Sequence, residues 1–418
     1  MKFSLSSVRD YAKNLALYFG ASLIPMLVNL AINPLIAMNM TPEDYAINGY
    51  YTSFSALISP VVLYYMLHYY NKRYFELDDD GRYRLRALVF RSLLLFSFAV
   101  AFVCLLALLI YLHFIKTDHT LPIYPYVILA VTAIPFVGIY QLELADSRMS
   151  KNSRRFFKLS MTAAFILIGL NLLLVVILKM GALGKMLAPL LANLSVFLFL
   201  LFKRRYYLSV PFDRNQFRKM IAFCTPLTIG AMLGYFTNGF DKTYLESLGE
   251  VREYGYYCVG SSIAAYLMTF SSAVNSTFQP DIYESIIHSD KRKLLTTVTI
   301  QMGVITAFVA LFVLFCPLII RILTAGRYMP STPYARVIAI STITSSLYYL
   351  VNDFTIAKGY PRLYLYTMIL GSVGIVVMMP WAISRFRFAG GAWMVSISYL
   401  LLIVANLLML LMLRRKRV

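Results

Sequence analysis

Charge is what this sequence has least of. Only 14% of its 418 residues are Asp, Glu, Lys or Arg, whereas 60% are hydrophobic. A soluble protein of ordinary composition has about 25% charged residues. Uncharged runs recur along the chain that reach the roughly twenty residues of a membrane-spanning helix. The composition therefore argues against a soluble fold and predicts an all-α polytopic membrane protein.

Motifs for cofactors and metals are also lacking. The four cysteines have unrelated spacings and form no CxxC, so we expect neither a disulfide framework nor a zinc site. The four histidines show no metal-binding spacing, and no GxxxxGK[ST] phosphate loop occurs. We therefore expect no cofactor, no metal and no direct use of ATP by this chain.

The basic residues that give the net charge of +20 cluster between apolar runs. With the N-terminus inside, 29 of the 39 Lys and Arg fall on the inner side, so the positive-inside rule predicts that both termini are cytoplasmic. We expect these loops to contact anionic lipid and no nucleic acid. The apolar runs predict twelve transmembrane helices, near 14–39, 45–70, 88–115, 122–145, 158–179, 185–202, 221–247, 254–277, 295–322, 333–357, 363–383 and 388–413.

The sequence also repeats at half its length. EDYAINGY and REYGYYCV align Tyr45 with Tyr254, an offset of 209 residues, and the spacing of the following helices agrees. Because six helices precede the repeat, both halves enter the membrane in the same direction, as in parallel-repeat transporters. We expect an N-terminal six-helix lobe over 1–205, a cytoplasmic linker over 206–220 and a C-terminal six-helix lobe over 221–418.

An acid and a base stand side by side after a long apolar run. Residues 220–240 are uncharged, and Asp241 and Lys242 follow directly. On a continuous helix, Asn238 and Asp241 share a face with two glycines. Two interpretations stay open: interfacial charges that meet water, or the wall of a polar cavity, which is the default for intramembrane charge.

Other polar residues in the apolar runs are candidates of the same kind. Asn29 and Asn33 lie on one face of the first helix, where they could join two helices or line a cavity. Glu143 and Asp353 lie late in helices four and ten; with Asp241, they are the acids placed to couple transport to an ion.

Two arginines near the outer side are candidate phosphate ligands. Arg321 ends a long uncharged run and Arg336 lies just inside helix ten. Together with Lys242 they could hold a phosphate. Their alternative role is to extend to the interface, as Arg commonly does at helix ends.

Four stretches carry a resemblance to a known family. They resemble the Wzx-type polysaccharide flippases of the multidrug/oligosaccharidyl-lipid/polysaccharide exporter superfamily, and the likeness extends over nearly the whole chain. Members usually have Asp followed by a basic residue, often Arg, where this chain has Asp241 and Lys242; Lys keeps the charge but loses bidentate geometry. The stretches are TPEDYAINGYYTSFSALISPVVLYYMLHYYNKRYFE, PLTIGAMLGYFTNGFDKTYLESLGEVREYGYY, FQPDIYES and ILTAGRYMPSTPY.

The resemblance implies a transporter rather than an enzyme. Its fold would be a V-shaped pair of six-helix lobes around a central cavity, with the Asn29 and Asp241 faces on that cavity. Its substrate would be undecaprenyl-diphosphate-linked oligosaccharide, moved from the cytoplasmic to the periplasmic leaflet of the bacterial inner membrane for O-antigen or capsule synthesis. H⁺ or Na⁺ is the expected coupling ion. Membrane lipids, a polysaccharide polymerase and a chain-length regulator are the expected partners.

Two alternatives stay open. A multidrug or organic-cation antiporter of the same superfamily would need a net acidic cavity, against which the cationic second half argues. A membrane-embedded glycosyltransferase or polymerase would need a catalytic acid or metal motif, often in a large outer loop. The outer loops here are short and contain no DxD or His–carboxylate motif.

Overall fold

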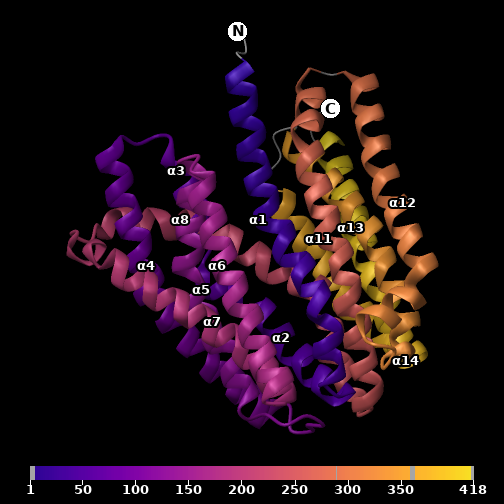
Figure 1. Ribbon diagram of the computed structural model, residues 1–418. Helices are drawn as coiled ribbons and strands as arrows, with labels where there is room; N and C mark the ends of the chain where they lie inside the picture. The colour runs from indigo at the N-terminus through magenta and orange to yellow at the C-terminus, as the bar shows by residue number, and fades with distance from the viewer. Residues whose placement is uncertain (1–4, 289, 358–362, 416–418) are drawn as a thin grey trace. The chain divides into compact units, whose positions relative to one another are not determined.

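The computed structural model describes residues 5–288, 290–357 and 363–415, and those residues form helices and their connections (Figure 1). Two of the α-helices continue into π-helical turns, Tyr111–Ile115 and Leu172–Ile177. The α-helices are α1 (Leu5–Met38), α2 (Pro42–Leu63), α3 (Met66–Tyr74), α4 (Asp79–Ile110), α5 (Tyr126–Met149), α6 (Ser153–Asn171), α7 (Gly181–Arg204), α8 (Arg214–Leu233), α9 (Tyr235–Asn238), α10 (Phe240–Leu245), α11 (Val251–Ile287), α12 (Lys291–Leu323), α13 (Thr332–Ala357) and α14 (Leu363–Arg415).

The chain forms two compact units. Unit 1 comprises Met1–Met40 and Ile58–Thr228, and unit 2 comprises Thr41–Leu57 and Ile229–Val418. The boundaries fall inside α2 and α8, so each of these helices contributes to both units. The division into lobes over 1–205 and 221–418 with a linker over 206–220 stays a prediction.

Eight helices in the described residues are long and apolar enough to cross a membrane. Their outward faces carry large apolar side chains, of which Phe114 is 80% exposed and Leu95 68%. In water such faces would be costly, whereas hydrocarbon is their natural surrounding. The chain is therefore a multi-pass membrane protein, and the count of twelve helices stays a prediction.

Four of the expected helices are not continuous or not separate. The run expected over 45–70 breaks at Tyr64 and Tyr65, whose φ angles of 49° and 50° lie in the left-handed region. The run expected over 221–247 is divided into α8, α9 and α10, with Gly239 at φ −151° and ψ −22°. In contrast, α14 covers two expected helices and bends between them at Arg387, where φ is 51°.

Local signals explain several helix starts. Asp78 accepts a hydrogen bond from the Gly81 backbone N–H at 3.0 Å and begins α4, and Asn152 does the same for Arg155 at the start of α6. These side chains satisfy donors that the first turn of a helix leaves without partners.

Unit 1 contains a buried ionic cluster. Glu143, only 2% exposed, accepts hydrogen bonds from Arg86 at 2.5 Å, from Arg204 at 3.0 and 3.1 Å, and from Arg155. Asp146 pairs with Arg86 at 2.6 Å and with Arg155 at 3.0 Å. The five side chains come from α4, α5, α6 and α7, so the cluster ties four helices together.

In unit 2, two glycines allow α2 and α11 to approach each other closely. A Cβ added to Gly255 would lie 2.0 Å from the Pro42 carbonyl oxygen, and one added to Gly49 would lie 2.3 Å from Cys258 Sγ. Small residues allow membrane helices to approach in this way. On the other side of the unit, α11 packs on α13 and α13 on α14.

Gly255→Ala should destabilise the protein, because the Pro42 backbone cannot move aside as a flexible side chain could. We expect a loss of about 1–3 kcal/mol, typical of overpacking. Gly303→Ala is the matched control, since a Cβ there would meet nothing within 4 Å. Thermal unfolding in detergent measures both; equal melting temperatures would contradict the contact.

Glu143→Gln should lower the melting temperature strongly. It removes one partner of a buried ionic cluster and leaves the guanidiniums of Arg86, Arg155 and Arg204 short of a negative charge. Breaking a buried pair in this way costs about 3–5 kcal/mol. Asp80→Asn, which removes an exposed pair with Arg84, is the control and should change little. A Glu143→Gln protein as stable as wild type would refute the structural role of the cluster.

Candidate functional site

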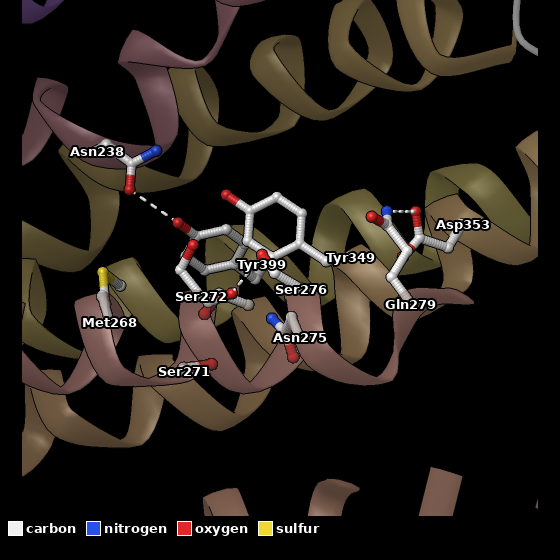
Figure 2. Close-up of a pocket in the computed structure, with 11 residues that line it drawn as sticks. Asn238, Met268, Ser271, Ser272, Asn275, Ser276, Gln279, Tyr349, Asp353 and Tyr399 are labelled. Atoms are coloured by element: carbon white, nitrogen blue, oxygen red, sulfur yellow. Dashed lines mark hydrogen bonds between the residues drawn. The ribbon is translucent and has the colours of Figure 1, made fainter. Parts of the chain in front are cut away.

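A polar cavity of about 290 Å³ lies in unit 2, and we call it the polar pocket (Figure 2). It is bordered by α11, α13 and α14, with the end of α9 contributing one side chain. Its lining is Asn238, Met268, Ser271, Ser272, Asn275, Ser276, Gln279, Ser345, Tyr349, Asp353 and Tyr399.

The polar pocket follows from helical periodicity on two neighbouring helices. On α13, Ser345, Tyr349 and Asp353 are spaced four residues apart and therefore lie on one face. The pocket residues of α11 also share one face of their helix, because each lies three or four residues from another. Its members are Met268, Ser271, Ser272, Asn275, Ser276 and Gln279.

Hydrogen bonds hold both ends of the lining. The Tyr399 hydroxyl donates to Asn238 Oδ1 at 2.7 Å, and Gln279 Nε2 donates to Asp353 Oδ1 at 2.9 Å (Figure 2). The first bond joins α14 to α9, and the second joins α11 to α13. The pocket wall is thereby fixed by contacts between different helices.

A buried glutamine orients the amide in the middle of the pocket. Gln301 on α12 is 2% exposed, and its Nε2 donates to Asn275 Oδ1 at 2.7 Å. Asn275 therefore has a support behind it, which reduces the side-chain freedom that a ligand would otherwise have to remove.

The chemistry of the lining is that of hydroxyls and amides. Among the eleven lining residues, Asp353 is the only one with a formal charge, and none is Lys, Arg or His. Tyr349 and Tyr399 add two aromatic rings. Such a surface can exchange hydrogen bonds with a ligand rich in hydroxyl groups and can contact its apolar faces with the rings.

The polar pocket brings together two residues that the sequence singled out separately. Asn238 was expected on a cavity and Asp353 as an ion-coupling acid, and both line this space. They lie at opposite ends of the pocket as drawn in Figure 2, each bonded to a different partner.

Asp241 does not share the face of Asn238 as a continuous helix would require. The break at Gly239 separates α9 from α10, so Asn238 is exposed whereas Asp241 is buried at 3% exposure. The Tyr257 hydroxyl donates a hydrogen bond to Asp241. Lys242, the next residue, is half-buried, and neither charged residue lines the pocket.

The two predicted phosphate ligands lie elsewhere in unit 2. Arg321 and Arg336 are both exposed, and neither lines the pocket. Arg336 Nε donates to the Val313 carbonyl oxygen at 3.1 Å, which anchors α13 to α12. The choice between a phosphate ligand and extension to the interface stays a prediction for both arginines.

The remaining candidates belong to unit 1. Asn29 Nδ2 donates to the Pro25 carbonyl oxygen at 2.9 Å, so its amide has a partner within α1 itself. Asn33 is half-buried on the same helix. Glu143 lies in the ionic cluster described above. Their roles in a cavity or in ion coupling stay predictions.

The serine and asparagine face of α11 is the main feature that the sequence reading missed. Its signal was present in MTFSSAVNSTFQ, where polar residues recur at helical spacing within a spanning helix. This face contains no charged residue, so a reading of the sequence based on charged residues does not detect it.

Comparisons with known proteins identify the family and the fold. A model of the family described as "Polysaccharide biosynthesis protein" matches residues 83–331, which is more than half of the chain. Among curated proteins, none matches the chain significantly.

Solved structures of transporters superpose on almost the whole chain. An inward-facing multidrug resistance MATE family transporter of the MOP superfamily has a TM-score of 0.66 at 14% identity, covering 96% of this chain and 99% of its own. The lipid II flippase MurJ, in an inward closed conformation, has a TM-score of 0.70 at 12% identity, covering 93% and 86%. A MOP superfamily transporter from Pyrococcus furiosus has a TM-score of 0.62 at 14% identity, covering 94% and 93%.

Identities this low establish the fold and leave the substrate open. Neither the family description nor these structures name an enzyme. The chain belongs to the Polysaccharide biosynthesis protein family, and its fold is the all-helical membrane fold of the MATE and MurJ transporters.

Proposed function

We propose that this protein is a flippase for undecaprenyl-diphosphate-linked oligosaccharide. It moves the lipid-linked glycan from the cytoplasmic to the periplasmic leaflet of the bacterial inner membrane, for O-antigen or capsule synthesis. Two findings support the proposal: membership of a polysaccharide biosynthesis family and a fold shared with a lipid II flippase.

The observation that carries the proposal is the composition of the polar pocket. A saccharide that enters a site loses the hydrogen bonds that its hydroxyl groups make with water. Side chains such as those of Ser272, Asn275 and Gln279 can replace those hydrogen bonds. Tyr349 and Tyr399 offer rings for the carbon faces of sugars. A pocket for an apolar drug would have few polar groups instead.

Transport would proceed by alternating access of two six-helix lobes, residues 1–205 and 221–418, joined by the linker 206–220, with both termini in the cytoplasm. The contact between Gly49 and Cys258 supports the parallel repeat. These two residues are 209 positions apart, the same offset that aligns the halves. Equivalent residues meet each other where a two-fold axis passes.

Ion coupling would drive the cycle. The bacterial interior is negative, and moving one elementary charge through 100 mV involves about 2.3 kcal/mol, so expulsion of an anionic diphosphate is already favoured. Of the three proposed acids, Asp353 has the most suitable place, because it lines the polar pocket. Asp241 is buried beside Tyr257. Glu143 is paired with three guanidiniums of the ionic cluster.

The diphosphate would need cations, and none of the described residues that line the polar pocket is one. Lys242, Arg321 and Arg336 remain the proposed ligands in unit 2. In this arrangement the sugar would bind in the polar pocket, and the phosphates would contact these basic residues outside the pocket.

A second candidate is export of an organic cation. Asp353 is the single charged residue among the described residues that line the pocket, and Tyr349 and Tyr399 can contact a cation through their ring faces. Under this alternative, Asp353→Asn abolishes efflux of a fluorescent organic cation from cells, and surface glycan is unaffected by loss of the protein. A flippase shows the opposite pair of results.

Ser276→Leu should reduce surface glycan about tenfold when it replaces wild type in a strain that depends on this protein, a change worth about 1.4 kcal/mol in binding. Leucine at this position occupies pocket space and removes a hydroxyl. Both Ser276 and its neighbour Thr277 are exposed, and each hydroxyl donates to its own helix, at 2.8 and 2.9 Å.

Thr277→Leu is therefore the matched control, because Thr277 does not line the pocket. Immunoblots establish equal protein levels, and gel staining of surface polysaccharide gives the readout. If both leucine variants display wild-type glycan, or both lose it equally, the polar pocket is not the saccharide site.

A further inference from the structure

A second cavity, of about 600 Å³, lies in unit 1 between α6 and α7, and neither the family nor the proposed transport cycle assigns it. We call it the basic groove. Three exposed cations line it: Arg154 and Lys158 from α6, and Lys203 from α7. Apolar side chains make up much of the rest: Leu159, Ile166, Val196, Phe199 and Leu200.

The cations and the apolar wall are arranged along the membrane normal. The apolar span Ser153–Ile177 begins at the cations of α6, and Gly181–Ser209 ends at the cation of α7. Because these consecutive helices are antiparallel neighbours, both charged ends lie at one membrane interface. From Lys158 to Ile166 the wall extends about 12 Å toward the bilayer centre, at 1.5 Å per residue.

The cations are available to an anion. Within the described residues, the side chains of Arg154 and Lys158 form no ion pair or hydrogen bond. Lys203 Nζ lies over the Phe199 ring, 5.4 Å from its centroid.

The one acid of the groove does not cancel this charge. Glu143 lines it, but the ionic cluster that surrounds Glu143 contains three guanidiniums for two carboxylates. One of those guanidiniums, on Arg155, is 31% exposed and also lines the groove. The whole region is therefore positive.

We propose that the basic groove binds a phosphorylated lipid. The phosphate contacts Arg154, Lys158 and Lys203 at the interface, and the hydrocarbon chain lies along Ile166 and Phe199. Basic pockets between transmembrane helices bind anionic lipid headgroups in this way. Two lipids share this chemistry, an anionic phospholipid of the leaflet and a polyprenyl phosphate, and the groove would recognise what they have in common.

The inference does not rest on the proposed flippase activity. It requires only that unit 1 lies in a bilayer. Lipid binding in the groove and transport are therefore independent, and either can occur without the other. Binding is therefore measured on the purified full chain, without a transport assay.

Native mass spectrometry of the detergent-purified protein tests the groove. Wild type should retain phosphatidylglycerol in preference to phosphatidylcholine of the same chains. Each of Arg154→Gln, Lys158→Gln and Lys203→Gln should weaken phosphatidylglycerol binding about fivefold, and the three together roughly a hundredfold. Arg205→Gln is the matched control, since Arg205 is an exposed cation next to α7 that does not line the groove.

Further measurements distinguish the two candidate lipids and check that each variant folds. Polyprenyl phosphate competing better than phosphatidylglycerol would identify a carrier lipid and support the proposal. Thr162→Trp, which fills the groove without changing charge, should also reduce binding, and melting temperatures check that each variant folds. Three results would overturn the proposal: no preference for anionic lipid, a triple variant that binds as wild type does, or full competition by inorganic phosphate alone.

Discussion

Hydrocarbon offers no hydrogen bonds, so every polar side chain within a spanning helix needs a partner inside the protein or access to a wet cavity. This constraint accounts for the surroundings of several polar residues of this chain. Glu143 is paired within a cluster of arginines, and Asn29 bonds to the backbone of its own helix. The face of α11 with Asn275 instead opens to a cavity. Polar groups that pair with the protein stabilise it, whereas those facing a cavity can bind a ligand.

The polar pocket and the basic groove divide two chemistries between two units. In unit 2, hydroxyls and amides with a single carboxylate suit a neutral, hydroxyl-rich ligand. In unit 1, cations above an apolar wall suit a phosphate on a hydrocarbon chain. The polar pocket is proposed for the saccharide of the transported molecule, whereas the basic groove is proposed for a phosphorylated lipid that the transport cycle does not require.

Composition and charge pattern were sufficient to predict a multi-pass helical membrane protein, because hydrophobic length and basic loops are local features of sequence. The exporter fold was implied by the resemblance of four sequence stretches to a known superfamily, and composition alone does not indicate it. The breaks were not predictable in the same way. Neither Tyr64 nor Tyr65 is a Gly, the residue that favours a left-handed backbone, and Gly239 stands in an apolar run long enough for one unbroken spanning helix. Partners of Glu143 come from three other helices, so nothing near it in sequence indicates the cluster. The polar residues on the pocket face of α11 recur every three or four residues, which the sequence shows. They are uncharged, however, so a reading based on charged residues did not single them out.

Reconstitution into liposomes tests the central claim most directly. The purified protein is incorporated with a fluorescent undecaprenyl-diphosphate oligosaccharide, and a membrane-impermeant quencher reports how much glycan has crossed. The account predicts crossing well above that of protein-free liposomes, at a rate that changes when a proton or sodium gradient is imposed. Crossing at the protein-free rate under every gradient, by protein that is folded and correctly inserted, would contradict it.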